Sequence, residues 1–183
     1  LDDCERTRLG KTADNLREGS LLIDDAAYTI DQVCYSIRRA HRKHGIKMAA
    51  IDYLQLLVSE RTKSMSREEV VAGMSAKLSG LANELRIPII LVAQLNRQCE
   101  QRSDKRPQLA DLRESGAIEQ DADKVVFLYR DAYYQQREEG QTGNGEGKLE
   151  IIVAKNRQGR VGREELYYLP QYQKITEIEA SSD

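Results

Sequence analysis

Lys47-Met48-Ala49-Ala50-Ile51-Asp52 and Pro88-Ile89-Ile90-Leu91-Val92-Ala93-Gln94 decide the fold class of this chain. Each stretch holds a short run of apolar residues that ends on a polar side chain, as a strand buried on both faces does. Between them, Ser66 and Glu69 form a helix-capping pair ahead of apolar residues at helical spacing. Strand, helix and strand in this order predict an α/β fold, with a mostly parallel sheet flanked by helices.

The chain before this unit predicts two helices and one further strand. Residues 2–16 carry many charges and few apolar side chains, and they predict a helix that stops at Gly19. Leu21-Leu22-Ile23 predicts a short strand. Thr29 and Gln32 then form a second capping pair, ahead of an amphipathic helix.

The chain after Gln94 changes from alternating strands and helices to strands alone. Apolar runs at residues 125–129, 149–154 and 166–169 are separated by glycine-bearing turns. This pattern predicts antiparallel strands added at one edge of the sheet. The four glycines from Gly140 to Gly147 predict a flexible loop.

Composition excludes several classes of protein. The 183 residues include 28 Lys and Arg against 30 Asp and Glu, so a uniformly basic nucleic-acid-binding surface is excluded. No apolar run approaches the roughly 20 residues that span a bilayer, which argues against a membrane protein. Cys4, Cys34 and Cys99 lack the spacing of a zinc site or a disulfide framework, which indicates a reducing, cytoplasmic location. The first residues hold neither an initiator methionine nor a signal peptide, so we expect an excerpt of a longer protein.

Polar residues end three of the predicted strands, at Asp52, at Gln94, and at Lys155 with Arg157. Ligands of α/β sheets bind at the carboxyl ends of the strands. Taken singly, each residue has an ordinary alternative: Asp52 as a turn or helix cap, Gln94 as a partner for a backbone group, and the cations as side chains reaching solvent. Together they match the needs of phosphoryl transfer, which uses a carboxylate for Mg²⁺, an amide near the attacking water and cations for the phosphate charge.

The phosphate-binding loop of such enzymes, G-x-x-x-x-G-K-[ST], is missing from the sequence. Gly10-Lys11-Thr12 matches its second half, but Glu5 stands where the first glycine is required. The residues before Gly10 are also charged and do not predict a strand. We therefore interpret Gly10-Lys11-Thr12 as an accidental match.

Four stretches together resemble the RecA-like motor domain of the bacterial and phage replicative DNA helicase family (DnaB-like). They are Ile51-Asp52-Tyr53-Leu54-Gln55-Leu56, Gln94-Leu95-Asn96-Arg97, residues 111–123 and Ala154-Lys155-Asn156-Arg157. The resemblance implies a RecA-like P-loop NTPase fold over residues 1–172, from which the P-loop strand, its helix and the catalytic glutamate are missing at the amino-terminal side. Residues 173–183 are expected to be a C-terminal tail.

The resemblance also implies a role for each matching residue. Asp52 corresponds to the Walker B aspartate that helps to hold Mg²⁺, and Gln94 to the glutamine that senses the γ-phosphate of ATP. Lys155 and Arg157 correspond to the cations that reach the nucleotide of a neighbouring subunit. Three further residues correspond to the loop against single-stranded DNA in the channel of a hexameric ring: Arg113, Glu114 and Gly116.

The residues themselves give a second argument for DNA binding. Residues 97–113 hold five cations and three anions among polar side chains, without aromatic residues. Loops of this composition can bind the phosphates of a nucleic acid whatever its base sequence. Charge runs are, however, also common on ordinary solvated surfaces. The five cations are Arg97, Arg102, Lys105, Arg106 and Arg113.

The family resemblance implies a portion of an ATP-dependent DNA helicase in the primosome, with ATP and Mg²⁺ as cofactors. Its implied partners are single-stranded DNA, other copies of itself, a primase and a helicase loader. We expect the chain alone to be inactive, because the phosphate cradle is missing. One alternative is a non-catalytic truncated paralogue that docks on a full-length helicase and offers Lys155 and Arg157. Another is a different RecA-like recombination ATPase.

Overall fold

The computed structural model describes residues 2–57, 65–134 and 147–177. Its helices are α1 Asp3–Glu18, α2 Ile30–His44, α3 Arg67–Leu85 and α4 Gly116–Asp121, with short 3-10 helices η1 Leu54–Leu56, η2 Arg97–Gln101, η3 Leu109–Ser115 and η4 Pro170–Tyr172. Its strands are β1 Ala49–Ile51, β2 Ile89–Leu91, β3 Lys124–Tyr129, β4 Gly147–Asn156, β5 Gly162–Leu169 and β6 Lys174–Glu177. Within these ranges, none of the helices combines the length and apolar character that crossing a bilayer requires.

The first part of the fold, which we call the helical region, consists of α2, α3, β1 and β2. The two strands pair in parallel, with Ala49 opposite Ile89 and Ile51 opposite Leu91. Both helices begin with the predicted capping boxes, at Thr29 and at Ser66. The apolar faces of the helices and strands meet in one cluster: Ile30, Val33, Cys34, Ile37, Ile51, Leu54, Val70, Val71, Met74, Leu78, Leu81, Ile87 and Ile118.

The second part, the antiparallel region, consists of the sheet β3-β4-β5-β6 and the 3-10 helices η2 and η3. Side chains along β3 alternate between exposed and buried, as expected of a sheet with one covered face. The covered face packs in a small cluster around Leu112, Val125 and Phe127. The α/β class with a parallel pair and antiparallel strands is therefore confirmed. The antiparallel strands were expected at one edge of the parallel sheet, and this placement is wrong: among the described residues they form a separate sheet, because β3 pairs with β4 and not with β1 or β2.

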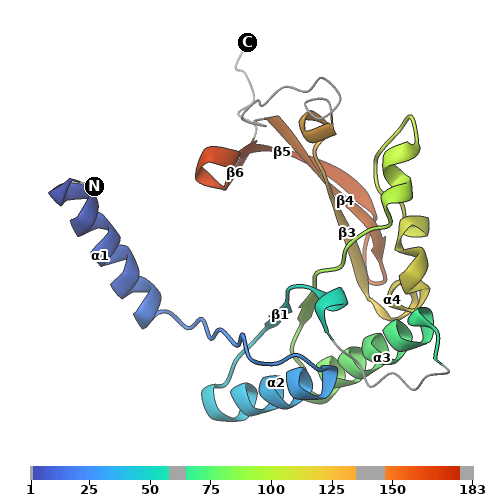
Figure 1. The fold of residues 1–183 in the computed structure, drawn as a ribbon, viewed down its shortest axis with the longest axis horizontal. Helices are drawn as coiled ribbons and strands as arrows, with labels where there is room; N and C mark the ends of the chain where they lie inside the picture. Colours follow the sequence, from blue (N-terminus) through green and yellow to red (C-terminus); the bar gives the residue numbers. More distant parts are fainter. Residues whose placement is uncertain (1, 58–64, 135–146, 178–183) are drawn as a thin grey trace.

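Figure 1 shows how the elements are arranged in space. The helices α2 and α3 lie along one side of β1, and the long strands β3, β4 and β5 lie beyond the amino-terminal end of α3. The short helix α4 lies beside α3 and leads directly into β3. The predicted helix at residues 2–16 is confirmed as α1, which is capped by Asp2 and extends away from the rest of the chain.

The strand predicted at Leu21-Leu22-Ile23 is wrong. These residues belong to no helix or strand, and their side chains are 66%, 50% and 84% exposed. A strand needs a neighbour to pair its backbone groups, and no strand among the described residues lies beside this segment. An apolar run alone therefore did not suffice to predict a strand.

Two other predictions concern the ends of β4 and β5. Most of the glycine-rich loop predicted up to Gly147 lies outside the described residues. The proposed boundary at residue 172 stays a prediction. The first residues after it include β6, which pairs with β5 along Leu166–Leu169.

Candidate functional site

The carboxyl ends of β1 and β2 place Asp52 and Gln94 at one edge of the parallel pair. The pairing continues past the strands, since the Val92 amide donates to the Ile51 carbonyl at 2.9 Å and the Leu54 amide to the Val92 carbonyl at 3.0 Å. Asp52 follows β1 directly, and its side chain is exposed. The carboxylate is therefore accessible to a ligand at the edge where α/β sheets bind them.

The backbone of Gln94 is fixed by a side chain that the sequence analysis did not single out. Gln55 donates through Nε2 to the Gln94 carbonyl at 3.1 Å and accepts from the Gln94 amide at 3.2 Å. The amide side chain of Gln55 thus takes the place of the next pair of backbone hydrogen bonds between the two strands. The side chain of Gln94 itself is exposed, so Gln55 holds the main chain and leaves the Gln94 amide group accessible.

Lys155 and Arg157 lie together at a different place, the carboxyl end of α4. Lys155 donates through Nζ to the carbonyls of Glu119 and Gln120, the second at 3.3 Å. Arg157 donates to the Gln120 carbonyl as well, and it forms an ion pair with Asp123 at 3.1 Å. Among the described residues, no hydrogen bond or ion pair joins these cations to Asp52 or Gln94, so one chain does not gather the four residues into one site.

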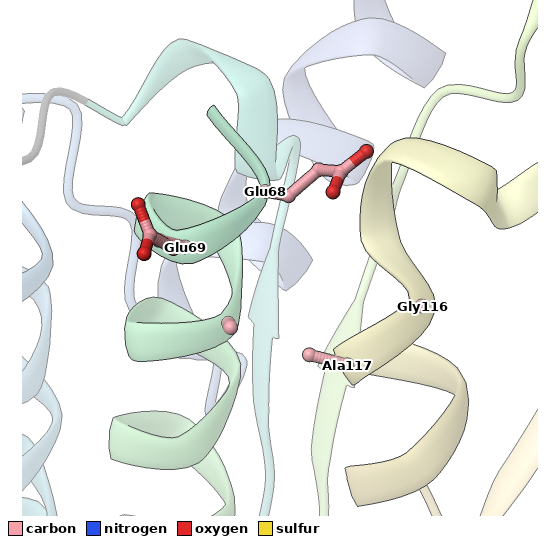
Figure 2. Close-up of a pocket in the computed structure, with 5 residues that line it drawn as sticks. Glu68, Glu69, Gly116 and Ala117 are labelled. Carbon is pink, nitrogen blue, oxygen red and sulfur yellow. The ribbon is translucent and has the colours of Figure 1, made fainter. Parts of the chain in front are cut away.

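The backbone of Arg113 and Glu114 lies in η3, and Gly116 begins α4. A hollow of about 280 Å³ adjoins Gly116 on one side, lined by the first turn of α3 and the start of α4. Figure 2 shows Glu68 pointing across towards α4, whereas Glu69 points away from it. The carboxylate of Glu68 makes this side of Gly116 unfavourable for a phosphate, because like charges repel.

Gly116 also has open space around it. Apart from its chain neighbours and the backbone of its own helix, a Cβ atom at this position would meet no atom within 4 Å. Its backbone is right-handed helical, with φ at −51°, so a larger residue can adopt the same conformation. A side chain added here would therefore disturb a bound ligand rather than the chain itself.

Two of the five cations predicted to face DNA are instead bound within the chain. Arg102 donates to both carboxylate oxygens of buried Asp111, at 2.9 and 2.7 Å, and these hydrogen bonds raise the pKa of Arg102. Arg106 forms a similar pair with buried Glu150. Both cations neutralise carboxylates that folding has removed from water, so they are not available to phosphates.

Asp111 connects two of the predicted site segments. Its carbonyl accepts from the amide of Asn96, two residues after Gln94, at 3.1 Å. Its carboxylate accepts from the Gln108 amide at 2.8 Å and so caps η3, which contains Arg113. Asp111 and Asp123 both lie in the segment that carried the resemblance, but spacing alone gave no sign that either has a cation partner.

The chain is similar to known proteins in both sequence and structure. Residues 1–177 match the model of the DnaB-like helicase C-terminal domain family. The replicative DNA helicase DnaB of Geobacillus stearothermophilus is 40% identical over 92% of this chain, and that of Rickettsia felis is 43% identical over 98%. The chain spans only 36% and 39% of these relatives.

Solved structures show the same relationship. One structure of a DnaB-like replicative helicase and its interactions with primase superposes with a TM-score of 0.74, at 40% identity, over 86% of this chain and 37% of that one. A second, of an ATPase domain, gives the same score and identity and has 54% of its length covered. At this identity, the likeness extends beyond the fold to the sequence.

Proposed function

Because this chain belongs to the DnaB-like helicase C-terminal domain family, we propose that it forms part of the motor of a replicative DNA helicase. The motor hydrolyses ATP, moves along single-stranded DNA and unwinds duplex. The observation that carries the proposal is the placement of Asp52 and Gln94 at the carboxyl edge of a parallel strand pair, in a chain about 40% identical to such helicases. This is the edge where α/β proteins bind nucleotides.

In this proposal, Asp52 helps to hold Mg²⁺ and Gln94 senses the γ-phosphate. Mg²⁺ in such sites is typically held by one or two carboxylates together with water and the phosphates of the nucleotide, and the exposed carboxylate of Asp52 fits this arrangement. When bound, Mg²⁺ neutralises charge on those phosphates. Gln55 fixes the backbone of Gln94, and the Gln94 side chain remains able to donate to a phosphate oxygen or a water molecule.

Lys155 and Arg157 act on the nucleotide of a neighbouring copy in a hexameric ring. Their place beside a separate sheet, where their described hydrogen bonds go to the end of α4 and to Asp123, supports a role in trans. Guanidinium and ammonium groups stabilise the charge that develops on a phosphate during transfer. Each subunit then supplies Asp52 and Gln94 to one nucleotide, and its two cations to the next.

DNA lies against the loop of Arg113, Glu114 and Gly116. Arg113 contacts phosphate, Gly116 allows close approach of the backbone, and Glu114 orients Arg113 or a neighbouring loop. Open space around Gly116 supports the proposed approach. Glu68 excludes phosphate from the hollow between α3 and α4, so DNA approaches from the other side.

We extend the proposal to the domain and its surroundings. Residues 1–172 form the motor portion and residues 173–183 a tail, and the protein acts in the cytoplasm. Besides DNA and its own copies, it engages a primase and a helicase loader. A primase partner is supported by the solved relative with primase interactions.

The test uses protein expressed from the complete coding sequence. Arg157→Ala should lower ATPase activity by about 10³ to 10⁵ and leave nucleotide binding intact, because an arginine supplied in trans acts in the transition state. Asp52→Asn should damage the metal site within its own subunit. Mixed rings of the two variants contain some wholly intact sites and should regain activity. Mixed hexamers without any activity would contradict the proposal.

The DNA loop needs its own test in the same ring. Arg113→Ala should weaken single-stranded DNA binding equally for all DNA sequences. The slope of log binding constant against log salt concentration should become shallower by roughly 0.7, the value for one lost single-strand phosphate contact. Gly116→Val should weaken binding by steric exclusion, without changing charge. Basal ATPase activity controls for an intact motor. If both variants bind DNA as the wild type does, the loop does not face DNA.

A further inference from the structure

The carboxyl end of α4 holds both functional cations in a defined orientation. The last carbonyl groups of a helix lack intrahelical partners and carry partial negative charge. Lys155 occupies two of them, those of Glu119 and Gln120, and Arg157 shares the second. Arg157 is further fixed through its main chain, since its amide donates to the carbonyl of Asp123 at 2.9 Å.

These contacts use only some of the available donors. A guanidinium group has five N–H donors and an ammonium group three. Arg157 uses one nitrogen on Gln120 and one on Asp123, while Lys155 makes two hydrogen bonds. Each cation therefore keeps donors for an external anion, and the Arg157 side chain is 51% exposed. The arrangement orients the cations without neutralising them fully.

The contact between Arg157 and Asp123 adds little to folding. The Asp123 side chain is 73% exposed, and exposed ion pairs contribute little because water and salt screen them. Orientation is a better explanation than stability for a carboxylate in this place. A long side chain held in its working geometry loses less entropy when it meets its target.

We propose that Asp123 is a positioning residue, which together with the carboxyl end of α4 orients Arg157 and Lys155 towards a phosphate on a neighbouring subunit. The inference rests on the proposed function, in which these cations act in trans. The same short helix begins at Gly116, in the predicted DNA loop, and ends at the cation pair.

The experiment compares Asp123→Ala, Asp123→Asn and Asp121→Ala in rings made from the complete coding sequence. We expect Asp123→Ala to lower the DNA-stimulated kcat about fivefold, because an exposed ion pair contributes only a small interaction energy. The KM for ATP and the melting temperature should not change. Asp123→Asn keeps an oxygen that accepts from Arg157 and should restore most of the rate. Asp121→Ala is the control, because the hydrogen bonds and ion pairs described for the two cations do not include this carboxylate.

The outcomes separate this inference from the proposed function. If Arg157→Ala loses activity but Asp123→Ala does not, the positioning role is wrong and the function stands. If neither variant loses activity, the function itself fails. Loss of kcat together with melting temperature and ring assembly would make Asp123 structural and overturn the inference.

A second measurement needs no activity. In this chain, the Arg157 guanidinium nitrogens should give separate, slowly exchanging nuclear magnetic resonance signals that merge in Asp123→Ala. Merged signals in the wild type would overturn the inference.

Discussion

Around β1 and β2, thirteen buried residues form one cluster, whereas the cluster around β3 and β4 has three. The helical region pairs strands of only three residues each, but two long helices cover them. The antiparallel region has strands of up to ten residues and little apolar burial. Apolar packing therefore dominates the stability of the first region, and backbone hydrogen bonds dominate that of the second.

Buried charge follows the same division. Asp111 and Glu150 are buried carboxylates, and both belong to the antiparallel region, where arginines pair with them. The ion pair between Arg38 and Glu84, which joins α2 to α3, is by contrast half exposed on both sides. Substitutions that remove apolar volume should therefore damage the helical region, and those that unpair charge should damage the antiparallel region.

The largest expected effect is that of Leu81→Ala in α3. Leu81 is 1% exposed, and such truncations typically cost about 2 to 5 kcal/mol through lost transfer free energy and the cavity left behind. Urea denaturation followed by circular dichroism should show this loss. Val126→Ala, on the exposed face of β3, is the control and should change stability by less than about 0.5 kcal/mol. Equal effects of the two substitutions would contradict the proposed contrast.

A smaller loss is expected from Glu150→Gln in β4. The Glu150 side chain is 8% exposed and pairs with Arg106 and Arg163. Glutamine keeps the shape but removes the buried counter-charge of Arg106 and leaves it only the exposed carboxylate of Asp104, at a cost of about 1 to 3 kcal/mol.

Glu165 offers a matched control, because it lies opposite Glu150 in the β4–β5 pair and binds Lys148 in solvent. Glu165→Gln should leave the urea midpoint nearly unchanged. A loss of stability as large as that of Glu150→Gln would mean that burial does not determine how much these ion pairs contribute to stability.

Much of the fold could be predicted from local pattern. Capping pairs at Thr29 and Ser66 marked helix starts correctly, because their hydrogen bonds span only three residues. The strand at Leu21-Leu22-Ile23 was wrong, because pairing depends on a neighbour that a local run does not reveal. The sequence also predicted polar residues at the strand ends, Asp52 and Gln94 among them.

The partners of the site residues could not be predicted in this way. Gln55 lies 39 residues from Gln94, and Asp123 lies 34 from Arg157. Such contacts depend on how the two sheets and α4 are placed, which side-chain spacing does not encode. For the same reason, the sequence did not reveal the buried partners of Arg102 and Arg106.

The stability of the antiparallel region at high pH depends on Tyr129. Burial, followed by the hydrogen bond to Asp131 at 2.6 Å, raises the pKa of the Tyr129 hydroxyl above its ordinary value of about 10. The folded state thus keeps a proton that the unfolded state loses. This contribution to stability is complete below about pH 10 and declines as the pH rises towards the raised pKa.

Absorbance at 295 nm should therefore show one of the nine tyrosines ionising later than the exposed ones. Above about pH 10, amide exchange should accelerate more in β3 and β4 than in α3. Tyr129→Phe removes the late step and serves as the control. Faster exchange in α3 than in β3 at this pH would contradict the prediction.

The smallest expected effect concerns the exposed ion pairs that join α2 to α3, those of Arg38 with Glu84 and of Asp31 with Lys77. Cys34 is buried in α2, and the ion pair between Arg38 and Glu84, at 2.6 Å, joins this helix to α3. Cys99 is buried in η2, which belongs to the antiparallel region. Burial raises the pKa of both thiols, so each reacts with a thiol reagent only when its surroundings open. Their labelling rates therefore report local opening in the two regions separately.

Raising sodium chloride from 0.05 to 1 M should accelerate labelling of Cys34 by a factor of about two to three relative to Cys99. Salt screens the exposed ion pair between Arg38 and Glu84. The ion pair between Arg102 and Asp111, near Cys99, is screened much less, because the Asp111 side chain is only 6% exposed. Exposed Cys4 reacts at once and provides the reference for reagent reactivity in each salt. In Glu84→Gln the salt effect on Cys34 should shrink, because the pair of Arg38 is lost while the exposed pair of Asp31 and Lys77 remains. If Cys99 accelerates as much as Cys34, salt opens both regions alike, and the distinction between exposed and buried ion pairs does not govern local opening.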